Sequence, residues 1–150
     1  MIFKATSPTV RYLKSEPKEC LALYVEHAFP DGLFCPGCDA YVDDLPADGN
    51  GRRVRCAACK KRFDVFEGSM IEFSRLELHA WLSIMFNSVS RERISGHQLA
   101  DLLGCEYSRI RYAIKAVDRV KSQLVKQSSW YRSSKFLALI RGCMVENSAA

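Results

Sequence analysis

The sequence lacks a long apolar run, and no stretch approaches the roughly 18 consecutive apolar residues that a membrane-spanning helix requires. Its first residues, MIFKATSPTVRYLKSEPK, lack the apolar core of a secretory signal. Repeats and low-complexity tracts are also missing. The chain of 150 residues is 48% hydrophobic and 26% charged, which is typical of a folded protein with one ordinary domain or two small ones. We therefore expect a soluble, cytoplasmic protein with no membrane partner.

Histidine is scarce. The three histidines, His27, His79 and His97, each fall in a segment with helical periodicity. They do not show the HExxH spacing that zinc-dependent hydrolases use to hold their metal. A surface or packed histidine is therefore the simpler interpretation of each one.

Cysteine, by contrast, is abundant, with seven in the chain. In a secreted protein this count would suggest disulfides, but the number is odd and no signal peptide is visible. Four of the seven form two pairs, CPGC at 35–38 and CAAC at 56–59, and 17 residues lie between the pairs. The other three, Cys20, Cys105 and Cys143, are predicted to be small hydrophobic core residues.

The two pairs have the spacing of a zinc ribbon, in which two Cys-x-x-Cys turns hold one tetrahedral metal ion. We predict a single Zn²⁺ bound by Cys35, Cys38, Cys56 and Cys59, with iron as the competing metal. Because cysteine fills all four positions, none is left for a catalytic water, and the metal is predicted to be structural. Its role would be to order a segment of about 35 residues that has too little core of its own.

Charge is distributed unevenly along the chain. The formal net charge is +5, yet residues 1–50 carry 4 basic and 8 acidic groups. Residues 51–100 carry 9 and 5, and residues 101–150 carry 9 and 4. The basic charge therefore lies after the first cysteine pair, and such asymmetry is typical of a nucleic-acid-binding surface.

Periodicity predicts a small α+β fold, with a zinc ribbon of short antiparallel strands followed by a helical helix-turn-helix module. The runs RRVRC and KRFDVFE read as the strands. SRLE at 74–77 predicts a capping box that starts a helix at Ser74, and shorter helices are expected over about 95–103 and 107–126. The chain divides into an N-terminal extension with a helix (1–32), the ribbon (33–70), the helical module (71–127) and an apolar C-terminal tail (128–150).

The segment ISGHQLADLLGCEYSRIRYAIKAVDRV fits a helix-turn-helix pattern. Gly104 stands where the turn needs a left-handed backbone, and Ala100 stands where the two helices cross closely. Ile110 and Ala113 follow at the spacing that packs the second helix on the first. Glu106 is a poor N-cap for that helix, since Ser or Thr is usual there.

A helical wheel divides the second helix into an apolar stripe and a basic polar face. An ordinary solvated helix can have the same composition, but the position after the turn favours a helix that reads the DNA major groove. Basic residues of the ribbon would hold phosphates without reading sequence, or would only make the protein soluble. The residues predicted to contact double-stranded DNA are Tyr107, Ser108, Arg109, Arg111, Tyr112, Lys115 and Arg119 of the helix and Arg53 and Lys61 of the ribbon.

Over residues 18–125 the chain resembles the N-terminal part of insertion-sequence transposases that begin with a zinc ribbon. The resemblance lies in the order and spacing of ECLALYVEHAFPDGLFCPGC, CAACKKRFDVFEGSMI, LELHAWLSIMF and RISGHQLADLLGCEYSRIRYAI. In that family the ribbon and the helices are taken to bind DNA ends, and an RNase H-like nuclease with acidic metal ligands follows. The resemblance therefore implies a DNA-binding module.

The resemblance does not extend to the nuclease, which needs a carboxylate set for two metal ions. The tail IRGCMVENSAA offers only Glu146, so we expect no enzyme activity from this chain. We predict a sequence-specific DNA-binding protein of the nucleoid, a transcription regulator derived from a transposase DNA-binding region. Two alternatives stay open: a module that docks on the transcription machinery, and a transposase fragment that works with a separate catalytic chain.

The tail contains an apolar segment, FLALIRGCMV, at 136–145. A segment this apolar is not expected to stay in water. It should pack against the helical module or against a second copy of the chain. Because many helix-turn-helix proteins bind DNA as dimers, the pattern favours a homodimer.

Overall fold

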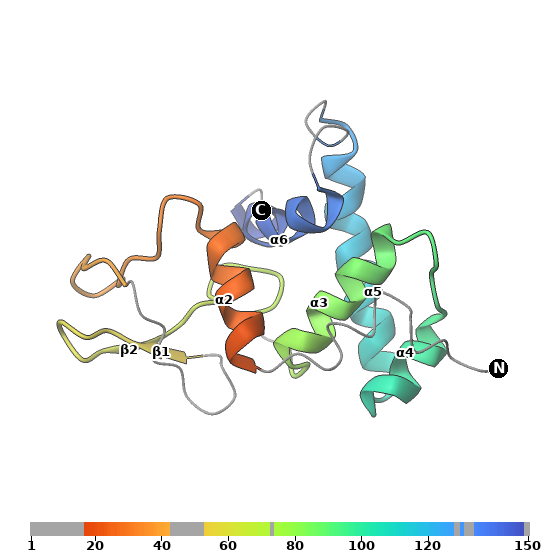
Figure 1. Cartoon of the computed structure of the whole chain (residues 1–150), viewed down its shortest axis with the longest axis horizontal. Helices are drawn as coiled ribbons and strands as arrows, with labels where there is room; N and C mark the ends of the chain where they lie inside the picture. The colour runs from red at the N-terminus through yellow and green to blue at the C-terminus, as the bar shows by residue number, and fades with distance from the viewer. Residues whose placement is uncertain (1–16, 43–52, 73, 128–129, 131–133, 149–150) are drawn as a thin grey trace.

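The computed structural model describes residues 17–42, 53–72, 74–127, 130 and 134–148, and it contains helices and one small sheet. Figure 1 shows the sheet at one end of the molecule, helices α3, α4 and α5 at the other, and α2 and α6 between them. This arrangement confirms a small α+β fold. The elements in chain order are α2 (Pro17–Ala28), β1 (Arg53–Arg55), β2 (Arg62–Asp64), α3 (Leu78–Val89), α4 (Gly96–Leu103), α5 (Tyr107–Leu124) and α6 (Lys135–Ser148).

The sheet consists of two short antiparallel strands that bury one face. Val54 of β1 pairs with Phe63 of β2, and both side chains are buried. Their neighbours in each strand point to the other face, because side chains alternate along a strand. The sheet is joined to the helices through Phe66, whose ring meets that of Tyr24 on α2 edge to face with 4.9 Å between centroids.

Helix α3 forms the centre of the helical core. Its buried residues cover most of the helix surface and include Trp81, Leu82 and Met85, each almost completely inaccessible to water. Helices α5, α2 and α6 all contact α3. A helix that is apolar on most sides needs such cover from several directions.

The predicted capping box at Ser74 is wrong, and α3 begins later, at Leu78. Its N-cap is Glu77, which makes no side-chain capping bond. The hydroxyl oxygen of Ser74 instead accepts hydrogen bonds from the Leu76 N–H (3.1 Å) and from the indole N–H of Trp81 (2.9 Å). Trp81 is fully buried, so its N–H requires a partner inside the protein, and Ser74 supplies it.

A capping box does form at the start of α4, where sequence reasoning did not place one. The N–H of Gln98 donates to the Ser95 hydroxyl at 3.1 Å, and the Ser95 N–H donates to the Gln98 side-chain oxygen at 2.8 Å. Two otherwise unpaired backbone donors are satisfied by this exchange. The start of α4 is therefore fixed by its own sequence.

The turn between α4 and α5 has the predicted backbone at Gly104. Its φ of 66° and ψ of 31° are left-handed, and the N–H of Cys105 bonds the Ala100 carbonyl at 3.1 Å. Glu106 precedes α5 and makes no side-chain capping bond, in agreement with its poor capping chemistry. Helix α5 ends at Leu124, two residues before the predicted end.

The predicted apolar tail forms α6 and packs within the chain itself. Phe136, Leu139 and Ile140 are buried, and the helix contacts α5, α2 and α3. Gly142 allows a close approach, because an added Cβ would lie 2.5 Å from a methyl carbon of Val120 on α5. The expectation of packing against the helical module is confirmed, and these three side chains are covered without a second copy. No helix among the described ranges is long and apolar enough to cross a bilayer.

Candidate metal centre and basic surfaces

The two cysteine pairs sit on turns of the same construction. In the first turn the Asp39 N–H bonds the Cys35 carbonyl at 2.8 Å, and in the second the Lys60 N–H bonds the Cys56 carbonyl at 2.9 Å. Asp39 and Lys60 both have positive φ, 62° and 67°. A left-handed residue directly after each second cysteine turns the chain back, so that both sulfurs of a pair face the same point.

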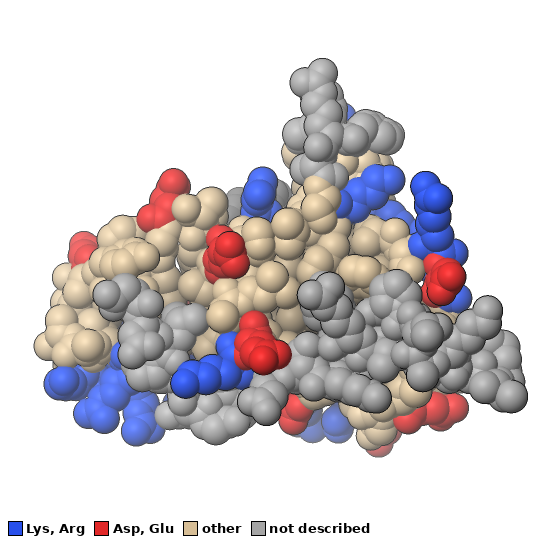
Figure 2. Space-filling view, in the orientation of Figure 1, with Lys and Arg blue, Asp and Glu red and all other residues tan. Residues whose placement is uncertain are grey.

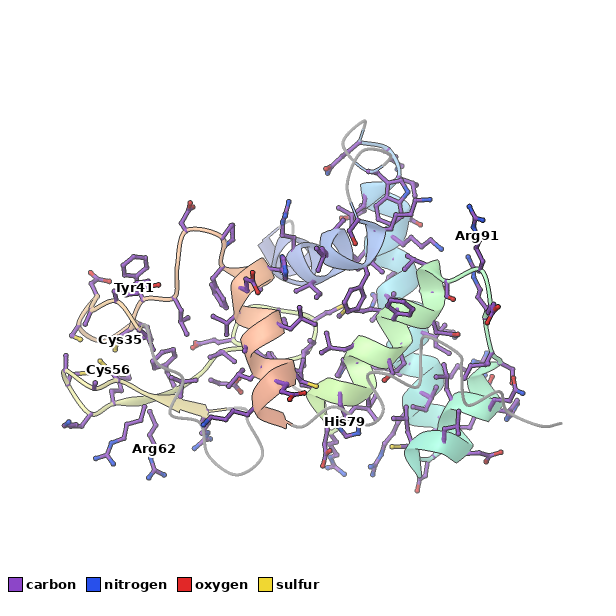
Figure 3. All side chains as sticks on the ribbon, in the orientation of Figure 1. Cys35, Tyr41, Cys56, Arg62, His79 and Arg91 are labelled. Atoms are coloured by element: carbon purple, nitrogen blue, oxygen red, sulfur yellow. The ribbon has the colours of Figure 1, made fainter. Side chains whose placement is uncertain are left out.

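The four sulfur atoms form one cluster. All ligand atoms of Cys35, Cys38, Cys56 and Cys59 lie within 4.8 Å of one another. The Sγ atoms of Cys35 and Cys59 are 3.6 Å apart, and those of Cys38 and Cys56 are 3.7 Å apart. A tetrahedron with metal–sulfur bonds of about 2.3 Å has edges of about 3.8 Å, so the cluster has the size that one metal ion requires. The cluster is visible between the two loops at the sheet end, near the labelled Cys35 and Cys56 (Figure 3).

The surroundings favour the charged form of some of these thiols and not of others. The backbone N–H of Cys59 is the main cause that lowers the pKa of Cys56, to about 6. The backbone N–H of Ala40 would lower the pKa of Cys38, but desolvation and the three neighbouring thiols outweigh it and raise that pKa to about 12. Four thiolates this close repel one another, so their joint ionisation requires a cation, and metal binding would release protons.

The donor set is complete without water or another residue. Four thiolates satisfy a tetrahedral ion, and one further donor, the N–H of Gly37, points to the sulfur of Cys35 at 3.3 Å. Cys35 and Cys56 are buried, whereas Cys38 and Cys59 are exposed on the outer side. The four cysteines are therefore positioned to bind one metal ion in a site that joins the two turns.

The exposed face of the sheet is basic. Arg53 and Arg55 alternate with buried Val54 and so point to solvent, and Arg55 stands opposite Arg62 in the strand register. Like charges at opposite positions disfavour a strand pair, so stability of the sheet does not explain this choice. Figure 2 shows the lysines and arginines of this end gathered along one edge, and Figure 3 shows Arg62 pointing away from the cysteines.

Lys61, predicted to contact DNA, lies against the first cysteine turn. A Cβ added at Gly37 would be 2.9 Å from the Lys61 side chain at Cδ and 3.7 Å from Nζ. A cluster of four thiolates and one divalent ion has a net negative charge, so an ammonium beside it is favourable. The side chain of Lys61 is nevertheless exposed. Its position suits both a DNA contact and a favourable charge interaction with the metal-bound cysteines.

Helix α5 presents most of its predicted DNA-contacting residues to solvent. Arg111 and Lys115 are exposed and lie on the side of the helix opposite the buried stripe. Tyr107 is different, because its ring stacks on that of His97 at the start of α4, with 3.8 Å between centroids and 12° between planes. This stacking joins the two helices, and only part of the ring remains available to a partner. The buried stripe consists of Ile110, Ala113, Ala116, Val117 and Val120.

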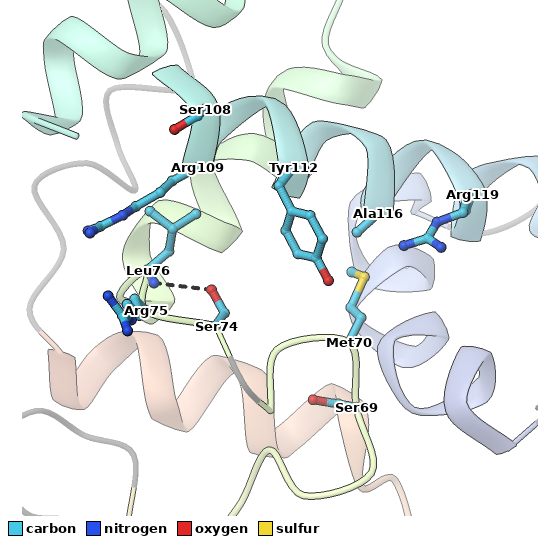
Figure 4. Close-up of a pocket in the computed structure, with 10 residues that line it drawn as sticks. All are labelled: Ser69, Met70, Ser74, Arg75, Leu76, Ser108, Arg109, Tyr112, Ala116 and Arg119. Carbon is cyan, nitrogen blue, oxygen red and sulfur yellow. Dashed lines mark hydrogen bonds between the residues drawn. The ribbon is translucent and has the colours of Figure 1, made fainter. Parts of the chain in front are cut away.

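The other predicted residues of α5 line a groove. Ser108, Arg109, Tyr112 and Arg119 form one wall, and five residues of the segment before α3 form the opposite wall: Ser69, Met70, Ser74, Arg75 and Leu76. Figure 4 shows Tyr112 projecting from α5 into the space between the two. The groove has a volume of about 560 Å³. Sequence reasoning missed the second wall, including Arg75, because it is separated from α5 by more than 30 residues and no local pattern connects them.

Comparisons with protein-family models, with curated proteins and with solved structures return no match for this chain. The resemblance to zinc-ribbon transposases therefore stays a prediction from the sequence. The functional argument depends on the geometry of the cysteine cluster and of the basic surfaces.

Proposed function

We propose that this chain is a sequence-specific, double-stranded DNA-binding protein ordered by one structural zinc ion, and that it acts as a transcription regulator. One observation carries the proposal. The pair α4–α5, joined at the left-handed Gly104, holds α5 so that Arg111 and Lys115 face solvent on the side opposite its buried stripe. In this proposal the pair is a helix-turn-helix and α5 is its recognition helix.

Zinc is the metal that best fits the cluster. Thiolate is a soft ligand, and a closed tetrahedral set of four favours zinc over the harder cations that oxygen ligands select. The sulfur separations of 3.6 and 3.7 Å match a tetrahedral edge for zinc. The ion would stabilise the ribbon, whose sheet has only three residues in each strand.

The two basic surfaces have separate tasks in this proposal. Arg111 and Lys115 are long donors on an exposed helix, and arginine is suited to bidentate contact with guanine in the major groove. Arg53, Arg55 and Arg62 lie on the solvent side of the sheet, where they would neutralise phosphates and fix the orientation of the protein. The chain itself performs no catalysis.

A second function, docking of the ribbon on the transcription machinery, is favoured by one specific feature. Phe34 and Tyr41 are held together by a bridge beside the first cysteine turn, and their rings meet edge to face at 5.6 Å. They are 49% and 61% exposed. Exposed aromatic pairs are more typical of a protein interface than of a phosphate contact. This function and DNA binding are not exclusive, because the pair belongs to the ribbon and Arg111 to the helical end.

The decisive experiment is selection from random double-stranded DNA with the purified, zinc-loaded chain. We expect enrichment of one sequence pattern, and binding to the selected site roughly a thousandfold or more tighter than to scrambled DNA. Absence of enrichment would contradict the proposal. Capture of an RNA polymerase subunit from a lysate, lost in Tyr41→Ala and Phe34→Ala, would then assign the ribbon to the docking function.

A further inference from the structure

The groove between α5 and the segment that carries Ser69, Met70, Ser74, Arg75 and Leu76 is concave, basic and centred on an exposed aromatic ring. Three of its ten lining residues are arginines, and none is acidic. Arg75 comes from the segment, whereas Arg109 and Arg119 come from α5, so positive charge enters from both walls (Figure 4). All three side chains are exposed. A site of this kind attracts an anion with several negative charges along its length.

The lining of the groove contains no acidic side chain. Glu72 accepts a hydrogen bond from the Gly68 N–H and is not part of the lining. The hydroxyl groups of Ser108 and Tyr112 add donors to the groove. The lining therefore combines three arginines with the hydroxyl donors that suit phosphate oxygens.

The ring of Tyr112 supplies a second kind of contact. It is 60% exposed although it lies between Arg109 and Arg119 along the helix, and Met70 lies opposite it (Figure 4). A phosphate group does not stack on an aromatic ring, whereas a nucleobase does. Arg109 and Arg119 are ten residues apart, which is about 15 Å along the helix axis and more than one nucleotide requires.

We propose that this groove binds an unpaired stretch of a DNA strand, with a base stacked on Tyr112 and phosphates held by Arg75, Arg109 and Arg119. A base pair inside a duplex cannot stack on Tyr112, because both of its faces are covered by neighbouring base pairs. A volume of about 560 Å³ suits a ligand of the size of a small molecule and is too small for a duplex. The occupant is therefore a nucleotide unit with its base exposed.

The groove is distinct from the surface proposed to read the duplex. At about 100° per residue, Arg109, Tyr112 and Arg119 form one stripe of α5, and Arg111, Lys115 and Ser122 form the next. The first stripe faces the opposite wall of the groove, and the second faces solvent. This inference rests on the proposed DNA-binding function, since it adds a site for an opened or single-stranded part of the same DNA.

The test compares the binding of four probes by fluorescence anisotropy: a blunt duplex carrying the selected site, the same duplex with a short unpaired tail at either end, a single-stranded oligonucleotide, and thymidine monophosphate as a competitor. The full zinc-loaded chain is used. We expect a tail to increase affinity at least about fivefold. The oligonucleotide should compete for this gain, and the mononucleotide should compete only at much higher concentration, because it lacks the further phosphates.

The variants separate stacking from phosphate binding. Tyr112→Ala should remove the gain from the tail, whereas Tyr112→Phe should retain it, because phenylalanine keeps the ring and loses only the hydroxyl. Arg109→Ala and Arg75→Ala should each reduce the gain and lower its salt slope by about one unit. Arg111→Ala is the matched control on α5, and it should weaken blunt-duplex binding and leave the gain unchanged. Circular dichroism and zinc content confirm that each variant is folded.

The outcomes separate this inference from the proposed function. Equal affinity for blunt and tailed duplexes, or a gain that survives Tyr112→Ala, overturns the unpaired-strand site even where specific duplex binding is seen. If Tyr112→Phe loses the gain, the hydroxyl group makes the contact, to a phosphate, and the ring does not stack on a base. This result also overturns the unpaired-strand site. Strong competition by the mononucleotide identifies a free nucleotide as the occupant and overturns the strand assignment. If the chain binds the single-stranded oligonucleotide through Tyr112 but does not bind the duplex, the unpaired-strand site is supported. The proposed duplex binding by α5 is then rejected.

Discussion

The Nζ atom of Lys121 on α5 lies 2.8 Å from the carbonyl oxygen of Ser88 in the last turn of α3. The bond ties together the two central helices across 33 positions of sequence. Partial burial, and secondly the charge of Arg93, lower the pKa of Lys121 below its ordinary value. A cation near the C-terminal end of a helix is favourable, because the last carbonyls of a helix carry partial negative charge. Lys121 therefore has a structural role in α5, in contrast to Arg111 and Lys115, which face solvent.

Replacement of Lys121 by alanine should lower the free energy of unfolding by about 1–2 kcal/mol, because a charged hydrogen bond to a helix-end carbonyl is lost. The lower end of this range is expected, since burial already penalises the charged amine. Urea denaturation at neutral pH measures the change. Lys115→Ala is the control, and its exposed side chain predicts a change of less than about 0.5 kcal/mol. Equal effects of the two substitutions would contradict a structural role for Lys121.

The pH dependence of this contribution follows from the direction of the shift. Because the pKa of Lys121 is lower in the folded state than in the unfolded state, the unfolded chain binds more protons between the two values. The free energy of unfolding therefore gains from this group as pH rises through the folded pKa towards 10.5. Wild-type protein and Lys121→Ala should differ in slope only in that alkaline window.

Local features of the fold could be read from the sequence. The cysteine cluster was predictable because two Cys-x-x-Cys turns need no information beyond their own spacing. The left-handed turn at Gly104 was predictable for a similar reason, since glycine there follows an apolar helical pattern. Each of these features is encoded by neighbouring residues.

Features that depend on distant contacts could not be read in this way. Ser74 has the local pattern of a helix cap, but the buried indole of Trp81 engages its hydroxyl. The groove brings Arg75 to α5 only because α3 packs on α5 in a particular way. The packing of the C-terminal helix on α2 is also a long-range contact, which no local pattern in the tail could indicate.

The backbone at Gly104 provides a test of the α4–α5 turn. Gly104→Ala should reduce stability by about 1 kcal/mol, because a Cβ disfavours a φ of 66°. A Cβ at this position would meet nothing within 4 Å, so the loss is due to the backbone conformation alone. Gly104→Asn should cost less, since asparagine tolerates the left-handed region better. Thermal denaturation of the three proteins gives the order, and an alanine variant as stable as wild type would contradict the assigned turn.

The geometry of the cysteine cluster leads us to expect one zinc ion per chain, and loss of that zinc when a ligand is replaced. Purified protein should contain one zinc ion per chain, and Cys56→Ser should lose it, because the sulfur of Cys56 is one of four ligands in a closed set. The ribbon should then unfold, since metal binding and folding of such a segment are coupled. Elemental analysis and limited proteolysis measure the two effects. Cys105→Ser is the matched control, because Cys105 lies outside the cluster and should leave zinc content unchanged. Undiminished zinc in Cys56→Ser would reject the assignment.

The two basic surfaces should respond differently to substitution when they bind duplex DNA. Arg111 lies on the exposed stripe of α5, and Arg53 lies on the solvent face of the sheet. If Arg111 reads a base, Arg111→Ala should cost about 1–3 kcal/mol on the selected site and relax the preference at particular positions. If Arg53 only neutralises a phosphate, Arg53→Ala should weaken binding to selected and scrambled DNA alike. It should also lower the salt slope by about one unit.

The quantity that decides between these roles is the ratio of the two affinities, measured at several salt concentrations. A phosphate contact multiplies both affinities by the same factor and leaves the ratio unchanged, whereas a base contact changes only the numerator. Lys115→Ala and Lys61→Ala provide a second member for each surface. Lys61 also lies beside the first cysteine turn, so the zinc content of the Lys61→Ala protein must be measured in parallel. A ratio unchanged in both α5 variants would remove α5 as the reading helix, and a ratio lost in Arg53→Ala would transfer sequence reading to the ribbon.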